Sequence, residues 1–154
     1  MPSLTTRPET PADMPFLLEV YAGARQEELN VAGWPEATRK AFVEMQFKAQ
    51  QQGYQTAFPL AERVIILEDD KPVGRMVVDR AEGEIRLVDI AVLPARRGRG
   101  LGKMLIEKLL LEAVEARKPV RLSVVKGLRA MHLYERLGFR KVGEDLLRQE
   151  MEWK

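Results

Sequence analysis

The segment Ile85–Lys103 constrains the fold of this chain more than any other part of the sequence. An apolar run of strand-forming residues ends at Pro94, and a loop with Arg96, Arg97, Arg99 and three glycines leads into a Leu-rich helical pattern. A glycine-rich turn lets a ligand approach the backbone closely, and the first turn of a helix leaves its N–H groups without intrahelical acceptors. The positive end of the helix dipole lies at the same place. The segment therefore predicts a site for an anion.

Two familiar phosphate-binding patterns do not fit this loop. The P-loop requires Ser or Thr after Gly-Lys and a glycine five positions earlier, but Met104 follows Gly102-Lys103 and Arg97 occupies the earlier position. The Rossmann pattern G-x-G-x-x-G also fails, because residues 98–103 read G-x-G-x-G-K. The pattern that fits is R-x-x-G-x-G, with Arg97, Gly100 and Gly102. A plain solvated connection rich in Arg and Gly is the alternative interpretation of so short a motif.

Placed after a strand and at the start of a helix, R-x-x-G-x-G resembles the acyl-CoA-binding motif of the GNAT superfamily of N-acetyltransferases. A second stretch, Ala130–Phe139, reads A-M-H-L-Y-E-R-L-G-F and resembles the superfamily signature A-x-x-L-Y-x-x-x-G-F. The two motifs stand in the expected order and at about the expected distance. The resemblance covers residues 62–145 by motif and the rest of the chain only by element order.

Hydrophobic periodicity and turn residues predict the elements. Strands are expected at residues 4–7, 64–67, 73–79, 85–93, 120–125, 139–144 and 148–153, and helices at about 13–28, 35–52, 101–116 and 128–137. Their order, βααβββαβαββ, matches the GNAT fold. The predicted fold class is therefore α+β, an α/β sandwich with a mixed, mostly antiparallel sheet of about seven strands flanked by helices. A single domain over residues 1–154 is expected.

Composition excludes several other classes of function. The chain has no cysteine and a single histidine, so it offers no disulfide framework, no thiolate nucleophile and no Cys-based or His-rich metal site. No apolar run approaches the ~18 residues of a membrane span, and the N-terminus lacks a signal-peptide pattern. We therefore expect a cytoplasmic protein with no metal and no membrane partner. Dimerisation is compatible with the sequence, but nothing in it establishes a homodimer.

The formal net charge of +2 conceals an asymmetry. Residues 1–90 contain 10 Lys or Arg and 15 Asp or Glu, a net charge of −5, whereas residues 91–154 contain 15 and 8, a net charge of +7. This distribution suits a polyanionic cofactor on the C-terminal half and a cationic molecule facing the N-terminal half, although chance patterning of a solvated surface gives the same numbers. Nucleic-acid binding is not expected, because no aromatic residues interleave with the basic run.

The resemblance implies acetyl-CoA as cosubstrate and assigns its contacts to two neighbouring segments. Backbone amides of the loop hold the coenzyme A diphosphate, with Arg96 and the side chains of the loop itself as a cationic rim. The pantetheine arm pairs with backbone near Ile90, Ala91 and Val92, and an N–H around Val92 polarises the thioester carbonyl. The loop residues implied are Arg97, Gly98, Arg99, Gly100, Leu101, Gly102 and Lys103.

Acyl transfer to an amine also needs a group that removes a proton, because an alkylammonium with a pKa near ~10.4 is only about 0.04% neutral at pH 7. Asp89 is the first candidate, as the only acid in the strand core that leads to the acyl site. Pairing of this carboxylate with Arg or Lys of a neighbouring element is the alternative. The family often places a glutamate earlier on this strand, where this chain has Arg86, so the base stays unassigned. Glu27 and Glu28 are alternatives for binding the acceptor.

Tyr134 matches the family's tyrosine that hydrogen-bonds the coenzyme sulfur and acts as general acid. A phenol (pKa ~10) is a weaker acid than a thiol (~8.5), so its help is expected mainly as a hydrogen bond in the transition state. Many members also carry Asn where this chain has Gly127, which puts one contact to the pantetheine arm in doubt. The resemblance implies an acetyltransferase for a primary amine of a small molecule or protein. A longer acyl-CoA donor, or a CoA-binding module without catalysis, are the alternatives.

Overall fold

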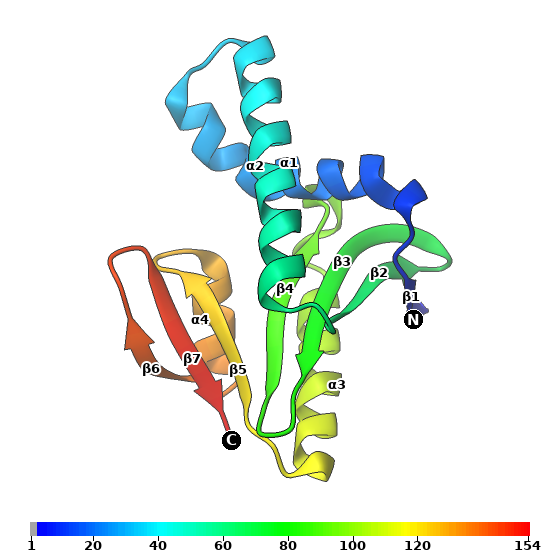
Figure 1. Cartoon of the computed structure of the whole chain (residues 1–154), viewed down its shortest axis with the longest axis vertical. Helices are drawn as coiled ribbons and strands as arrows, with labels where there is room; N and C mark the ends of the chain where they lie inside the picture. The colour runs from blue at the N-terminus through cyan, green and yellow to red at the C-terminus, as the bar shows by residue number, and fades with distance from the viewer. Residues whose placement is uncertain (1–2) are drawn as a thin grey trace. The chain divides into compact units, whose positions relative to one another are not determined.

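The structure is a computed structural model that describes residues 3–154, apart from the side chains of residues 27, 28 and 30–32. Within residues 3–154, seven strands and four α-helices follow one another in the predicted order (Figure 1). They are β1 (Leu4–Pro8), α1 (Met14–Ala32), α2 (Glu36–Ala57), β2 (Glu62–Glu68), β3 (Lys71–Arg80), β4 (Ile85–Val92), α3 (Leu101–Ala116), β5 (Val120–Val125), α4 (Arg129–Arg136), β6 (Arg140–Glu144) and β7 (Arg148–Trp153).

The strands form one mixed sheet in the order β1-β2-β3-β4-β5-β7-β6. The β4–β5 pair is parallel, whereas the β1–β2, β5–β7 and β6–β7 pairs are antiparallel. This topology confirms the predicted fold class. Residue contacts group the chain into two compact units, one of residues 1–77 and 89–101 and one of residues 78–88 and 102–154. Strands β3 and β4 contribute residues to both units.

The first unit contains α1, α2, β1 and β2, and its core lies where the two helices meet β2. Leu17 of α1, Phe47 of α2 and Ile65 of β2 are buried together. The ring of Tyr21 packs on Phe47 with centroids 5.8 Å apart. Because each helix contributes one apolar face to this cluster, burial of apolar surface holds α1 and α2 against the strand.

Both helices of the first unit are longer than predicted. α1 extends to Ala32 rather than fading near residue 28, and Gly33 ends it in the left-handed conformation (φ 66°). α2 passes through Gly53 and ends at Ala57. A glycine inside a helix costs only about 1 kcal/mol relative to alanine, so it does not by itself end a helix whose neighbours are packed. The prediction that α2 ends before Gly53 was wrong for this reason.

The second unit contains α3, α4 and β5–β7, with the end of β3 and the start of β4. The ladder between β4 and β5 consists of two pairs, Ile85 with Val120 and Arg86 with Arg121, and the antiparallel β5–β7 ladder runs from Val120 to Val125. The apolar side chains buried here come from β4, α3, β5 and β7 and from the residue before β6, namely Ile85, Leu87, Ile106, Leu109, Val120, Leu122, Phe139 and Met151. The unit therefore has a hydrophobic core of its own.

Helix α3 is less buried than its sequence suggests. Leu105, Ile106 and Leu109 are in the core, but Leu111 is 68% exposed and Val114 is 60% exposed. Although the sequence of α3 is Leu-rich, these two apolar side chains lie on the same outward face as the charged ones. No helix among residues 3–154 has the length and apolar character needed to cross a bilayer.

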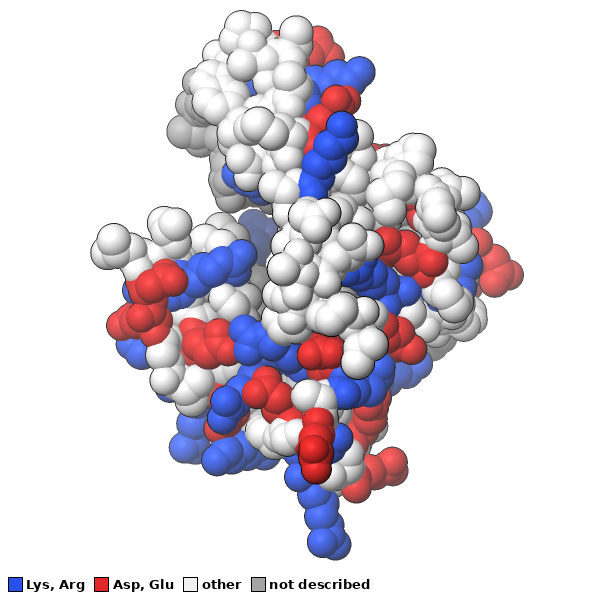
Figure 2. Space-filling view, in the orientation of Figure 1, with Lys and Arg blue, Asp and Glu red and all other residues white. Residues whose placement is uncertain are grey.

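Many of the charged side chains are paired within their own unit. In the second unit Arg80 binds Glu112 (2.6 Å), Arg86 binds Glu150 (2.6 Å) and Arg121 binds Glu152 (2.7 Å). The Arg80 hydrogen bond holds the pKa of the Glu112 carboxyl below its usual range. Figure 2 shows basic and acidic side chains intermingled over the face in view. Two of these pairs join an arginine of residues 1–90 to a glutamate of residues 91–154, so they do not cancel the difference in net charge between the two parts of the sequence.

Candidate active site

The loop after β4 has a backbone that only a glycine-rich sequence adopts readily. A short 3-10 turn, Pro94–Arg96, follows the strand. Gly98 and Gly100 then take the left-handed conformation, with φ of 78° and 77°. A side chain would strain both positions, whereas glycine adopts them freely. Turns of this kind direct successive N–H groups toward a common point and so favour an anion.

Gly102, in the first turn of α3, needs a different explanation. Its φ is not in the left-handed region, and apart from its chain neighbours and the nearby backbone of α3, no atom of the described residues lies within 4 Å of a Cβ built on it. Neither backbone conformation nor packing within the protein therefore requires a glycine at this position. A glycine here lowers helix stability by about 1 kcal/mol relative to alanine, so access of a ligand to the helix start is the physical reason that remains.

A buried carboxylate, which the sequence analysis missed, contacts the arginines of this loop. Glu68 ends β2 and its side chain is 6% exposed. One oxygen, Oε1, accepts hydrogen bonds from Nη1 of Arg96 (3.3 Å) and Nη1 of Arg99 (3.4 Å). Arg97 instead donates from Nε to the carbonyl oxygen of Val92 (3.3 Å). The expected cationic rim is therefore partly neutralised by an acid from outside the loop, about 30 positions earlier in the chain.

The end of β4 carries the residues expected to face the pantetheine arm. Ile90, Ala91 and Val92 are each partly exposed, and the N–H of Leu93 donates to the carbonyl oxygen of Val73 (2.8 Å). At Gly74 of β3 a Cβ would overlap the carbonyl oxygen of Ala91 and lie 3.0 Å from the Cα of Val92. The backbone of β3 thus approaches this part of β4 so closely that only a glycine fits.

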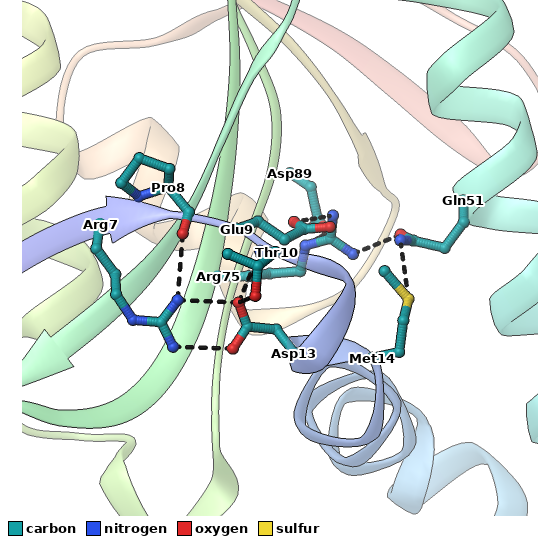
Figure 3. A network of polar contacts seen from close by, with 9 residues as sticks. All are labelled: Arg7, Pro8, Glu9, Thr10, Asp13, Met14, Gln51, Arg75 and Asp89. Atoms are coloured by element: carbon teal, nitrogen blue, oxygen red, sulfur yellow. Dashed lines mark hydrogen bonds and ion pairs between the residues drawn. The ribbon is translucent and has the colours of Figure 1, made fainter.

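Asp89 lies beside a buried arginine. This agrees with the alternative prediction that its carboxylate pairs with Arg or Lys of a neighbouring element. Arg75 of β3 is 2% exposed, and its Nε is 3.9 Å from Oδ2 of Asp89, which is 21% exposed. Nη1 of Arg75 donates to Oε1 of Gln51 in α2 (2.7 Å), and Nη2 donates to Oε2 of Glu9 (3.4 Å). Figure 3 shows these side chains converging on Arg75. The guanidinium therefore links β4 to α2 and to the segment before α1.

Two properties of this network bear on its chemistry. The formal charges of the two carboxylates, Glu9 and Asp89, and of the Arg75 guanidinium sum to −1. A net negative charge favours a cationic ligand nearby. The Nε of Arg75 has no hydrogen-bond partner among the described residues, although it is buried. A buried donor of this kind is uncommon, and a shorter contact to Asp89 or a bound water would satisfy it.

A groove of about 880 Å³ adjoins the same network between α1 and α2. Its apolar wall includes Met14, Leu18 and Phe47, and its polar lining includes Glu9 and Gln51. Because both polar residues also bind Arg75, the groove and Asp89 belong to one connected set of contacts. This combination of an apolar wall and a few fixed polar groups is typical of small-molecule sites.

Asp13, next to this groove, belongs to a second ion pair, with Arg7. Nη2 of Arg7 donates to Oδ1 (2.8 Å), and the N–H of Thr10 donates to Oδ2 (2.8 Å). These hydrogen bonds, that of Arg7 first, hold the pKa of the Asp13 carboxyl well below its usual range. Asp13 directly precedes α1, but its carboxylate binds Arg7 and Thr10 and makes no capping hydrogen bond to that helix.

Tyr134 lies in the second unit, on α4, and is 7% exposed. Its ring packs on Phe139 with centroids 5.5 Å apart, and its carbonyl oxygen accepts a hydrogen bond from the N–H of Phe139 (3.0 Å). Gly138 between them has φ 103°, which explains why the stretch needs a glycine there. The downstream signature is thus a short helix and a left-handed turn that fix the position of the tyrosine ring.

Three other positions raised by the sequence have clear outcomes. Arg86, where the family often has a glutamate, forms a two-pronged ion pair with Glu150 of β7 (2.6 and 3.1 Å). His132, the single histidine of the sequence, is exposed. The side chains of Glu27 and Glu28 lie outside the described part of the structure.

The sequence profile of the acetyltransferase (GNAT) domain matches residues 61–141, slightly more than half of the chain. The protein therefore belongs to the GNAT acetyltransferase family, a family of acyltransferase enzymes. A curated relative, the [ribosomal protein bS18]-alanine N-acetyltransferase of Haemophilus influenzae, is 32% identical over 78 residues, which are 50% of this chain and 53% of the relative. The chain thus matches only about half the length of that protein.

Solved structures show the same fold over nearly the whole chain. The PaiA N-acetyltransferase of Thermoplasma acidophilum, in complex with coenzyme A, has a TM-score of 0.73 at 16% identity and covers 99% of both chains. A GNAT acetyltransferase of Elizabethkingia anophelis with acetyl-CoA bound has a TM-score of 0.63 at 14% identity, covering 98% of this chain and 97% of the other. Similarity at this level of identity establishes the fold alone; the Thermoplasma structure contains coenzyme A and the Elizabethkingia structure contains acetyl-CoA.

Proposed function

We propose that the protein transfers an acetyl group from acetyl-CoA to a primary amine of a small molecule or protein by direct attack. The observation that carries the proposal is the loop after β4. Two of its glycines adopt the left-handed conformation. The third, Gly102, leaves the start of α3 accessible to a ligand, although neither its backbone conformation nor packing requires a glycine there. Family membership makes acyl-CoA the natural anion for this site.

The diphosphate of the cosubstrate is proposed to bind the backbone amides of residues 97–103. These amides and the unpaired N–H groups of the first helical turn supply hydrogen bonds together with the positive end of a helix dipole. The pantetheine arm is proposed to pair with backbone at Ile90, Ala91 and Val92, and the N–H near Val92 to polarise the thioester carbonyl. The close approach of Gly74 supports this assignment because it holds that stretch of β4 in a fixed conformation.

In the proposed reaction the neutral amine nitrogen attacks the thioester carbon and the C–S bond breaks. The proton that the nitrogen gives up as the amide forms passes, directly or through water, to the leaving sulfur, so that coenzyme A leaves as its thiol. The ammonium form of the acceptor first loses a proton to Asp89, directly or through water. The carboxylate of Asp89 and the negative charge of its network support this role, because both favour a cationic acceptor. Tyr134 is proposed to donate a hydrogen bond to the leaving sulfur, on the resemblance of residues 130–139 to the family signature.

The groove between α1 and α2 supports an acceptor with an apolar body as well as an amine. The Haemophilus relative is named for an alanine of a ribosomal protein, so an N-terminal alanine peptide is a reasonable member of an acceptor panel. A longer acyl donor and a non-catalytic CoA-binding module are the alternatives. The cytoplasmic location stays a prediction from the sequence, and a homodimer stays compatible with the sequence without being predicted by it.

Two measurements test the proposal. Calorimetric titration with coenzyme A is expected to show one saturable site per chain in the wild type, and Gly102→Ala is expected to weaken it about tenfold or more while leaving the melting temperature unchanged or raised. Thiol release from acetyl-CoA with a panel of amines, including alkylamines, polyamines and an alanine peptide, separates an enzyme from a silent binder. Absence of saturable binding by the wild type at millimolar coenzyme A would refute the proposed function.

A further inference from the structure

Glu68 is buried at one end of β2, in a position that the surrounding backbone fixes firmly. Leu4 of β1 pairs with Glu68 in the antiparallel β1–β2 ladder. Beyond it, Asp69 and Asp70 form a tight turn with φ of 50° and 67°. The N–H of Ser3 donates to the Asp69 carboxylate (2.8 Å), and the N–H of Asp69 donates to the Ser3 carbonyl (2.8 Å). The backbone that carries the Glu68 side chain is therefore held in a fixed position.

The two arginines that Glu68 binds flank the first half of the loop. Arg96 ends the 3-10 turn, and Arg99 stands between the left-handed Gly98 and Gly100. Both guanidinium groups donate to the same oxygen, and both are partly exposed, with 38% and 53% of the side chain accessible. A single buried carboxylate thus ties together two points of a loop whose glycines would otherwise leave it flexible.

We infer that Glu68 is a positioning residue for the diphosphate of the cosubstrate, an inference that rests on the proposed function. By holding Arg96 and Arg99, Glu68 keeps the amides between them in the conformation that accepts the diphosphate. When a binding-competent conformation is only partly populated, the apparent dissociation constant rises in proportion. Loss of the carboxylate therefore weakens acyl-CoA binding even though it removes a negative charge close to a polyanion.

Electrostatics alone predicts the opposite change in acyl-CoA affinity, so the direction of the change tests the inference. If Glu68 did nothing for the loop, its removal would free two cations and strengthen the binding of a diphosphate. If it positions the loop, its removal weakens binding. The direction of the change therefore decides between the two roles before its size is considered.

The test compares two donors in the full-length protein. Glu68→Gln preserves the shape of the side chain and removes its charge. With acetyl-CoA, kcat/KM is expected to fall about tenfold through KM, with kcat at saturation nearly unchanged. With S-acetylpantetheine, which has the thioester and the arm but no diphosphate, kcat/KM is expected to stay within twofold of the wild type. A structural defect that reaches the whole site would lower both.

Asp70→Asn is the matched control, because it makes the same change of charge two residues away. Asn tolerates the left-handed conformation that Asp70 adopts, so this variant is expected to keep wild-type kinetics with both donors. If Glu68→Gln does not fold, Glu68→Asp keeps the charge, shortens the side chain and is expected to show a smaller loss with the same donor selectivity. Equal losses with both donors, no change, or tighter binding of acetyl-CoA overturns the inference. Wild-type protein that binds no coenzyme A would instead overturn the proposed function.

Discussion

Replacement of Gly74 by alanine adds one methyl group at the closest approach between β3 and β4. The new Cβ would overlap the carbonyl oxygen of Ala91 and lie 3.0 Å from the Cα of Val92. Neither atom belongs to a flexible side chain, so the backbone of β4 itself has to move. The displaced residues are two of the three that are proposed to pair with the pantetheine arm.

The expected size of the effect follows from this geometry. Overpacking of a well-packed site costs about 1–3 kcal/mol. For a chain of this length a loss of ~2 kcal/mol corresponds to a decrease in melting temperature of roughly 4–8 °C. A displacement of the reacting groups by about 1 Å costs on the order of 10²-fold in rate. Gly74→Ala is therefore expected to fold, to melt several degrees lower and to lose about two orders of magnitude in kcat/KM for acetyl-CoA.

Gly53→Ala provides a control with the same chemical change. Gly53 lies inside α2, and a Cβ built there has no atom of the described residues within 4 Å. Alanine at such a helical position is expected to stabilise the protein by about 0.5–1 kcal/mol. Thermal unfolding and thiol release from acetyl-CoA are measured on both variants. A Gly74→Ala variant with the melting temperature and kcat/KM of Gly53→Ala would refute the close packing of β3 on β4 and its role.

Three further changes test other parts of the structure. Tyr134→Phe is expected to lower kcat by about 10²–10⁴ with unchanged calorimetric affinity for coenzyme A, and near-normal kcat would remove the phenol from the mechanism. Asp89→Asn is expected to lower kcat and, because it removes the carboxylate beside a buried guanidinium, also to lower the melting temperature; a loss of stability without a loss of kcat would leave Asp89 only a structural role. For Asp13, whose pKa is depressed in the folded state, the stabilising contribution is present above the pKa of the unfolded chain, about 3.9, and is lost as the pH falls through the lower folded value. Asp13→Asn is therefore expected to melt below the wild type at pH 7, and the difference is expected to shrink as the pH falls from 4 to 2; a difference that is the same at pH 7 and pH 2 would contradict this linkage.

The fold was predictable because its signals are local. The strand over residues 85–92, the glycine loop and the start of α3 follow one another in the chain, and the period of apolar residues distinguishes strand from helix without any knowledge of neighbours. Helix ends were less predictable. Whether α2 stops at Gly53 depends on the packing of residues beyond it, which a local pattern does not contain.

The site, too, has a part that the sequence predicts and a part that depends on contacts between residues distant in the chain. The loop from Arg97 to Lys103 is contiguous, so the sequence alone identifies it. The contacts of Glu68 with the loop arginines and of Arg75 with Asp89 join residues that are 14 to 31 positions apart. They depend on the order of β2, β3 and β4 in the sheet and on the alignment of residues along these strands. The available signals were an acid at the end of a strand, Glu68, and an arginine within an apolar strand, Arg75. Neither signal identifies the residue with which the side chain pairs.

The contacts of Arg75 have a consequence for attempts to change the acceptor by exchanging helices between relatives. Its guanidinium joins Gln51 of α2, Glu9 before α1 and Asp89 of β4. A chimera that takes α1 and α2 from a relative without compatible groups at positions 9 and 51 would leave the buried Arg75 guanidinium without these two partners. An exchange of α1 and α2 in this protein therefore has to include Arg75 of β3 together with residues 9 and 51.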